Sequence, residues 1–134
     1  MIVVSACLAG VNCNYRGKNS ENDLVVNLVK EGRALMVCPE QLGGLTTPRP
    51  PAEIKNGKVF TVEGADVTEA FNRGAAEVLN VCMKYGCKKA ILRAQSPSCG
   101  SGKICDGNFN GVLIDGDGVT AALLKKHGIE VTVL

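Results

Sequence analysis

Aromatic side chains are scarce in this chain of 134 residues, which has no tryptophan, two tyrosines and three phenylalanines. Proteins that bind single-stranded nucleic acid stack its bases on aromatic rings, so we expect no nucleic-acid polymer as a partner. Excess charge is also small: the formal net charge is +2, and the two signs are interspersed. The composition therefore predicts neither an extended nucleic-acid surface nor a membrane-binding face.

Long apolar runs and histidine are the next deficits. No run is long enough to span a bilayer, and residues 1–10, although apolar, have no basic region before them. We interpret that stretch as a first strand rather than a signal peptide and expect no membrane association. The single histidine, His127, precedes a glycine that ends a predicted helix, so we interpret it as structural. A Cys–His nucleophile is not supported.

No Cys-x-x-C pair occurs, although structural zinc sites usually draw on such pairs. Cysteine itself is abundant. Because the number is odd and the pattern is not that of a small disulfide scaffold, we predict a reducing, cytoplasmic compartment. There, several cysteines beside turn residues indicate metal binding or catalysis rather than crosslinks. The seven cysteines are Cys7, Cys13, Cys38, Cys82, Cys87, Cys99 and Cys105.

Short apolar runs alternate with helical patterns along the chain. This alternation predicts one domain, residues 1–134, of three-layer α/β/α class with a mostly parallel central sheet and small hairpin excursions. Caps at Ser20, at Asp66 and at Asp117 begin the predicted helices. Strands are predicted at 2–5, 33–37, 90–93 and 129–134, helices at 22–31, 66–85 and 117–127, and hairpins at 54–59 and within 104–114.

Three cysteines follow three of the predicted strands directly: Cys7, Cys38 and Cys99. The carboxyl ends of parallel strands lie along one edge of a sheet, which is where ligand sites form in open α/β folds. We therefore expect these thiols to meet. The glycine-rich loop 96–102 is further predicted to surround Cys99 with backbone N–H groups that favour its thiolate.

Three separated thiols with no obvious fourth ligand suit an iron–sulfur cluster that leaves one iron open. Alternatively, Cys13 completes a zinc site with the same three cysteines. The remaining cysteines look different: Cys82 lies on the apolar face of a helix, and neither Cys87 nor Cys105 is surrounded by a strand-end loop.

Polar residues near these cysteines supply further candidates. Glu40, two residues after Cys38, is the nearest general acid or base. Three serines are positioned to hydrogen-bond a cluster or a substrate, and basic loop residues to offset negative charge or hold a polar substrate. The serines are Ser96, Ser98 and Ser101, and the basic residues are Arg16, Lys18 and Arg49.

Several motifs resemble the DUF523 domain family, in order and over essentially the whole chain. That resemblance implies a [4Fe-4S] cluster held by Cys7, Cys38 and Cys99, and a thiolated pyrimidine that loses its sulfur to the open iron without redox chemistry. It also implies that Glu40 and Ser96 act at the substrate in proton transfer and hydrogen bonding. The motifs are Ser5-Ala6-Cys7-Leu8, Val37-Cys38-Pro39-Glu40, Pro48-Arg49-Pro50-Pro51-Ala52-Glu53, Asp66-Val67-Thr68, Ser96-Pro97-Ser98-Cys99-Gly100-Ser101 and Gly118-Val119-Thr120-Ala121-Ala122-Leu123-Leu124.

The sequence thus predicts a desulfurase that acts on a small thiocarbonyl compound of the 2-thiouracil kind. Two alternatives remain at this point: a non-catalytic metal or iron–sulfur module with a sensing or carrier role, and a zinc-binding protein. Glu40 discriminates between an enzyme and a carrier, because only an enzyme that activates water needs its carboxylate.

Overall fold

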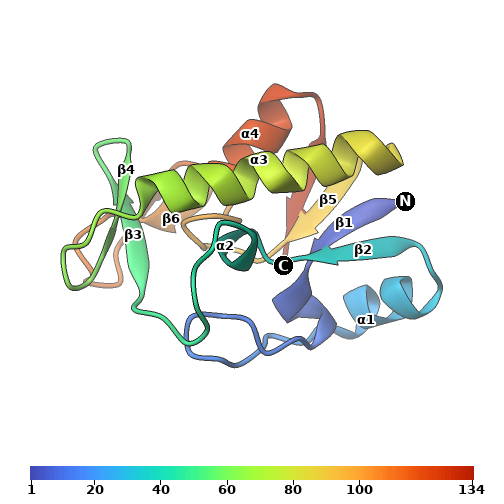
Figure 1. Cartoon of the computed structure of the whole chain (residues 1–134), viewed down its shortest axis with the longest axis horizontal. Coiled ribbons are helices and arrows are strands. Elements are labelled where there is room, and N and C mark those ends of the chain that lie inside the picture. The colour runs from blue at the N-terminus through green and yellow to red at the C-terminus, as the bar shows by residue number, and fades with distance from the viewer.

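A four-stranded parallel sheet forms the centre of the protein, described here by a computed structural model of residues 1–134 (Figure 1). The strand order is β2-β1-β5-β8, so β1 and β5 lie in the interior of the sheet. Each strand is four residues long: β1 (Ile2–Ser5), β2 (Ala34–Val37), β5 (Lys89–Leu92) and β8 (Glu130–Val133). The predicted parallel α/β sheet is confirmed.

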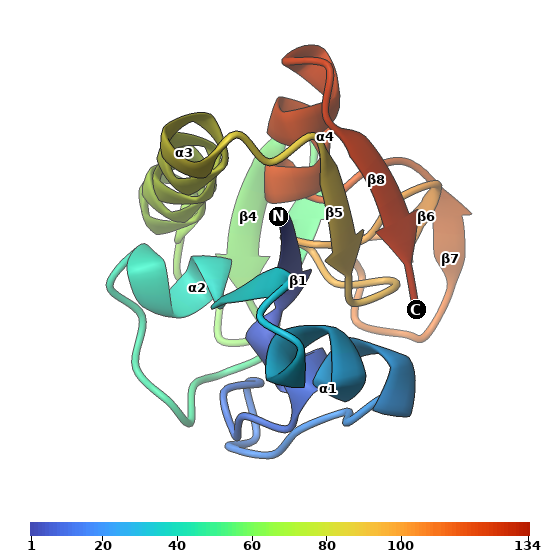
Figure 2. The same ribbon diagram turned by 90° about the vertical axis from the view of Figure 1, so that its right-hand side faces the viewer.

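Helices cover both faces of this sheet, which makes three layers (Figure 2). Helix α1 (Asp23–Lys30) packs on one face around the fully buried Val25, with Val4 and Leu8. Helices α3 (Thr68–Tyr85) and α4 (Val119–Lys126) pack on the other face and enclose the larger apolar core. None of the helices combines the length and the apolar composition that crossing a bilayer requires.

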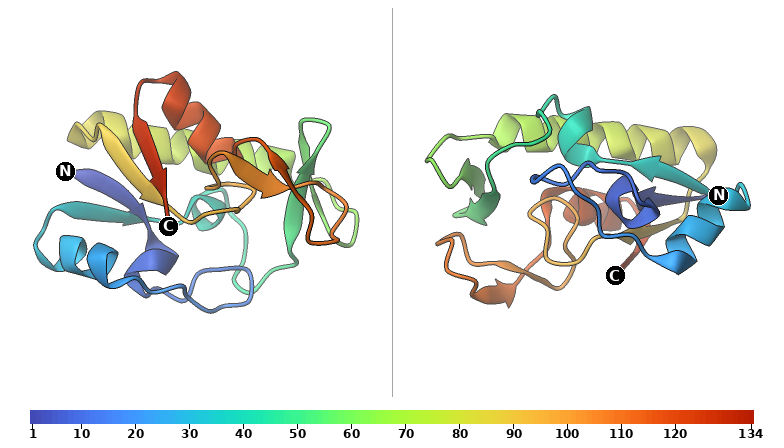
Figure 3. Two further views of the ribbon diagram at one scale, coloured as in Figure 1. Left: turned by 180° about the vertical axis from the view of Figure 1, so that it is seen from behind. Right: turned by 90° about the horizontal axis from the view of Figure 1, so that it is seen from below.

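Two antiparallel hairpins stand beyond the carboxyl ends of the sheet strands (Figure 3). The first pairs β3 (Ala52–Lys55) with β4 (Lys58–Thr61), and the second pairs β6 (Lys103–Cys105) with β7 (Leu113–Asp115). Glu53 joins them, because its Oε1 accepts hydrogen bonds from the backbone N–H groups of Gly107 at 3.0 Å and Phe109 at 3.1 Å. Both hairpins were predicted, but their connection was not.

The predicted caps were wrong in all three helices. Asn22, not Ser20, caps α1 by accepting backbone hydrogen bonds from the first turn. Asp66 lies just before α3 and accepts a hydrogen bond from Thr68 N instead of capping the helix. Asp117 precedes α4, but its Oδ1 accepts from Gly102 N at 2.9 Å. Its carboxylate therefore fastens the loop that follows Ser101 instead of capping a helix.

Two short helices went unpredicted, and both start at the sheet edge. The 3-10 helix η1 (Ala6–Ala9) follows β1, and α2 (Pro39–Leu42) follows β2. Helix α2 lies backbone to backbone against α3: a Cβ on Gly74 would overlap the carbonyl oxygen of Pro39, and one on Gly43 would overlap that of Ala70. Glycine at these two positions therefore fixes α2 and the residues it carries.

Candidate functional site

A cavity of about 410 Å³ opens at the carboxyl ends of the sheet strands, and the hairpins close part of its wall. Cys7 reaches it from η1, Cys38 from the residue before α2, and Cys99 from the loop after β5. The three cysteines selected from the sequence therefore line one space. Cys13 lines the same cavity. All seven cysteines of the chain are free thiols.

Cys13 lies between Cys7 and Cys38, and its hydrogen bonds to them set the pKa values of all three thiols apart. Its thiol hydrogen-bonds both neighbours, which lowers the pKa of Cys7 and lowers that of Cys38 to about 6, while the pKa of Cys13 itself is raised. The N–H of Gln41 and the charge of Arg49 add to the effect at Cys38. Near neutral pH Cys38 is therefore a thiolate, beside the neutral thiol of Cys13.

Cys99 contradicts the thiolate predicted for it. It is almost wholly buried, and burial raises the pKa of its thiol to about 12, although the Ser5 hydroxyl donates a hydrogen bond to Sγ at 3.5 Å. Desolvation outweighs that donor because a charge in an apolar core loses its water.

The predicted ring of inward N–H donors is also absent, because loop 96–102 uses its own donors. The N–H groups of Ser98 and Cys99 bind Ser96 Oγ at 3.1 and 3.0 Å, and that of Gly100 binds the Ser96 carbonyl at 2.8 Å. Ser96 lines the cavity. Since both lone pairs of its hydroxyl are occupied, Ser96 has one function left toward a ligand, which is to donate its proton.

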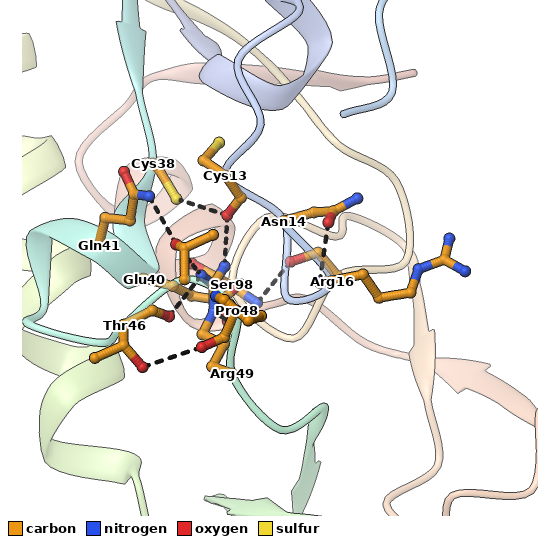
Figure 4. Close-up of polar contacts among 12 residues, drawn as sticks. Cys13, Asn14, Arg16, Cys38, Glu40, Gln41, Thr46, Pro48, Arg49 and Ser98 are labelled. Atoms are coloured by element: carbon orange, nitrogen blue, oxygen red, sulfur yellow. Dashed lines mark hydrogen bonds and ion pairs between the residues drawn. The ribbon is translucent and has the colours of Figure 1, made fainter. Parts of the chain in front are cut away.

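Glu40 and Arg49 form a partly buried ion pair in the wall of the cavity (Figure 4). Arg49 Nε lies 3.1 Å from Glu40 Oε1, and their side chains are 5% and 18% exposed. Cys38 precedes α2, Pro39 begins it, and Glu40 lies in its first turn. The carboxylate and the thiol of Cys38 are thus held by the same short segment.

The three candidate serines have separate places. Only Ser96 lines the cavity. Ser98 is fully buried, and its hydroxyl lies 2.7 Å from that of Thr120 at the start of α4, so it fastens the Cys99 loop to the core. Ser101 is partly buried but does not line the cavity. Ser98 thus does not line the cavity, and a contact of its hydroxyl with a cluster or substrate stays a prediction.

The cavity-lining residues that the sequence analysis did not select include Glu53, Arg93, Gln95 and Cys105. Gln95 adopts a left-handed backbone with φ of 66° directly before Ser96, a conformation that non-glycine residues rarely take. Cys105 was set aside because it does not follow a main strand. Glu53 and Cys105 lie in the two hairpins and reach the cavity because the hairpins fold back over the sheet edge, which no local sequence pattern predicts.

The donors suit a cluster better than a single ion. No three of the His, Cys, Asp and Glu side chains converge tightly enough to ligate one metal ion. The thiols of Cys7, Cys38 and Cys99 are instead distributed around a shared cavity. The corners of an iron–sulfur cube lie several ångströms apart, and thiolates are its usual ligands. The arrangement thus fits an iron–sulfur cluster and does not favour the zinc alternative.

Comparisons with known proteins agree with one another. The model of a family described as 2-thiouracil desulfurase matches residues 2–134. A protein of Bacillus subtilis called YbbK, which is uncharacterised, is 46% identical over 141 residues, covering 98% of this chain and 93% of its own length. The solved structure of a [4Fe-4S]-dependent thiouracil desulfidase, TudS, is 48% identical with a TM-score of 0.94, over 98% of this chain and 89% of that one.

Proposed function

This chain belongs to the 2-thiouracil desulfurase family, and we propose that it removes sulfur from thiolated pyrimidines of the 2-thiouracil kind with a [4Fe-4S] cluster. The observation that carries the proposal is one cavity lined by Cys7, Cys38, Cys99, Glu40 and Ser96. Its volume lies within the usual range for small-molecule sites. The solved relative with the same fold is itself named as a [4Fe-4S]-dependent thiouracil desulfidase.

Cys7, Cys38 and Cys99 are the residues proposed to hold the cluster. When bound by three cysteines, such a cluster supplies one iron without a protein ligand, a Lewis acid with affinity for sulfur. Cys13, whose pKa is raised by its hydrogen bonds to Cys38 and Cys7, would lie as a neutral thiol beside two of these ligands. Hydrogen bonds to ligand sulfurs adjust the electronic properties of a cluster.

Glu40 is the proposed base. Its carboxylate lines the cavity in the first turn of α2 and accepts a proton from the water that attacks the ring carbon bearing sulfur. The net reaction replaces C=S with C=O, consumes one water and releases sulfide, so no electron donor or acceptor is needed. Ser96 donates its hydroxyl proton as a hydrogen bond to the reacting substrate, the one role its occupied lone pairs leave.

The test is Glu40→Gln in anaerobically reconstituted protein, assayed for loss of sulfur from 2-thiouracil. The amide preserves the size of the side chain but cannot take a proton, so we expect desulfuration to fall about 100-fold or more at unchanged iron content. Glu69→Gln is the matched control, because the Glu69 side chain is 93% exposed and lies outside the cavity.

Full activity of Glu40→Gln with its cluster intact would contradict the proposed mechanism. A wild-type protein that binds iron and sulfide but desulfurates no thiolated pyrimidine would instead favour the carrier or sensor alternative. The two results are distinguishable, because the first concerns only the base and the second concerns the reaction.

A further inference from the structure

Arg49 is the most heavily engaged side chain in the cavity wall (Figure 4). Besides the ion pair with Glu40, its Nη1 donates to the Thr46 carbonyl at 3.1 Å and to Thr47 Oγ1 at 2.9 Å. Its Nη2 donates to the carbonyl of Cys13 at 2.9 Å. The backbone N–H of Arg49 also donates to the Tyr15 carbonyl at 2.8 Å. Arg49 thus connects three separate segments of the chain.

The guanidinium has little left to offer a ligand. It carries five N–H donors, and the contacts to Glu40, Thr46, Thr47 and Cys13 use four of them. These acceptors lie on different sides of the group, so only a planar fork reaches them all. A lysine ammonium, a point charge with three donors, cannot span the same acceptors.

The Cys13 carbonyl accepts a hydrogen bond from Arg49 Nη2 at 2.9 Å. Through its bonds to this carbonyl and to Glu40, Arg49 fastens the loop that carries Cys13 to the segment that carries Cys38 and Glu40. A shift of Arg49 would move the carboxylate relative to both cysteines.

We propose that Arg49 is the positioning residue of the reaction rather than a substrate ligand. It occupies Oε1 of Glu40 and so leaves Oε2, which has no partner in the protein, as the oxygen that takes the proton. The anchors at Thr46, Thr47 and Cys13 fix that orientation. This inference rests on the proposed function, since it assigns the geometry of the same base.

Arg49→Lys is the decisive variant, because it keeps the positive charge and removes the fork. With Glu40 free to turn, we expect kcat for 2-thiouracil to fall about 100-fold, as a displacement near 1 Å can cost, while KM changes by less than about threefold. Arg33→Lys is the matched control: the Arg33 side chain also pairs with a carboxylate, that of Glu31 at 3.3 Å, but it is 68% exposed and lies outside the cavity. Its kcat should stay within about twofold of wild type.

Three outcomes would overturn the proposal. A kcat of wild-type size in Arg49→Lys would mean that charge alone matters. A raised KM at unchanged kcat would make Arg49 a substrate ligand. If Arg49→Lys lost iron but kept the wild-type rate per remaining cluster, the role of Arg49 would be to support the cluster-binding cysteines and not to position Glu40.

Two further measurements separate positioning from a general loss of folding. Guanidinium ion added to Arg49→Ala should restore part of kcat, which a misfolded cavity would not allow. The double variant Arg49→Lys with Glu40→Gln should be no slower than Glu40→Gln alone, because Arg49 acts through that carboxylate. Multiplied losses in the double variant would contradict this.

The contact itself is testable without turnover. In nitrogen-15-labelled full-length protein prepared without iron, the side-chain N–H signals of Arg49 should be resolved and slow to exchange, and Glu40→Gln should shift the Nε–H signal. Rapid exchange of the Arg49 side-chain protons would show that its hydrogen bonds to Glu40 and the other acceptors do not persist, which would refute the proposal. Failure of the wild type to desulfurate any thiolated pyrimidine would instead refute the proposed function and leave this result standing.

Discussion

Cys38 and Cys99 line the same cavity, but their surroundings shift their thiol pKa values in opposite directions. Cys38 precedes a short helix, receives hydrogen bonds from the Cys13 thiol and the Gln41 N–H, and has a pKa lowered to about 6. Cys99 lies in the core cluster among α3, α4 and the sheet, and burial raises its pKa to about 12. One thiol is ionised in advance, and the other keeps its proton.

This difference teaches how such a centre assembles. Ligand cysteines must be deprotonated, so metal binding releases protons wherever the free thiol still holds one. At neutral pH Cys38 offers a thiolate, whereas we expect Cys99, as a proposed ligand, to give up its proton when the metal binds. We therefore expect the Cys38 side of the cavity to be ionised before metal binding and the Cys99 side to lose its proton on binding.

The largest expected effect comes from removing any one of the three proposed ligand thiols. Cys7→Ser, Cys38→Ser and Cys99→Ser should each lose the cluster, because a hydroxyl does not replace a thiolate ligand. In wild type, anaerobic analysis should find about four irons and four labile sulfides per chain. Cys82→Ser serves as control, since Cys82 is buried in the core away from the cavity. Retention of the cluster in Cys99→Ser would show that the buried side is not needed.

Glycine contacts fix the two sides separately, so they can be disturbed one at a time. Gly74→Ala places a methyl group into the Pro39 carbonyl and should cost about 3 kcal/mol of unfolding free energy, displacing α2 with Glu40. Gly118→Ala, whose Cβ would lie 2.5 Å from Ser98 backbone atoms, should disturb the Cys99 side by a comparable amount. Denaturant unfolding measures both.

Alanine at the exposed Gly32 is a useful reference, because nothing lies within 4 Å of its added Cβ and any cost there comes from its positive φ of 70°. If Gly74→Ala cost no more than Gly32→Ala, the close approach of α2 and α3 would not be what fixes Glu40.

Thiol chemistry reports the comparison directly. In metal-free protein, iodoacetamide should modify Cys38 at a rate that rises through pH 6 and then levels, because its thiolate is already formed. Cys99 should remain protected at pH 7 by more than about 100-fold, and its rate should still be rising well above pH 9. Mass spectrometry of the modified peptides gives both profiles. Equal rates at pH 7 would remove the contrast.

The smallest effect concerns the anchor of the Cys99 loop. Ser98→Ala removes the 2.7 Å hydrogen bond to Thr120 and leaves the Thr120 hydroxyl buried without that partner, for a loss of about 1–2 kcal/mol. Adding Thr120→Val should recover part of it, because both polar groups are then gone. Iron content should be unchanged in each variant. Loss of the cluster from Ser98→Ala would mean that Ser98 serves the centre directly.

The sheet and its edge were the parts accessible to sequence. Strand patterns predicted β1 at Ile2–Ser5 as observed and the other main strands within a residue or so, and parallel topology brought Cys7, Cys38 and Cys99 to one cavity. Their role as ligands stays a prediction. The hairpin predicted at 54–59 was likewise found, because its two-residue turn, Asn56-Gly57, is a local sequence signal.

Long-range contacts were the parts that sequence left open. Burial sets the pKa of Cys99 and was not visible from the polar loop around it. From its local sequence Ser98 looks like an exposed loop residue, but in the structure it is buried against Thr120 of α4. Glu53 and Cys105 reach the cavity only because the hairpins fold back, and Asp117 binds a loop instead of its own helix.

The attachment of the hairpins has a consequence for how this family can diversify. Cys7 and Cys99 lie in η1 and in the loop after β5, and Cys38 and Glu40 lie at the start of α2. Part of the cavity wall comes instead from the two hairpins, which are joined through Glu53 Oε1 and through the hydrogen bond from Lys55 to Asn108. Substitutions in the hairpins can reshape the chamber without touching the segments that hold the thiols. Changes in the hairpins can therefore alter which substrate fits the cavity while the proposed reacting residues stay the same.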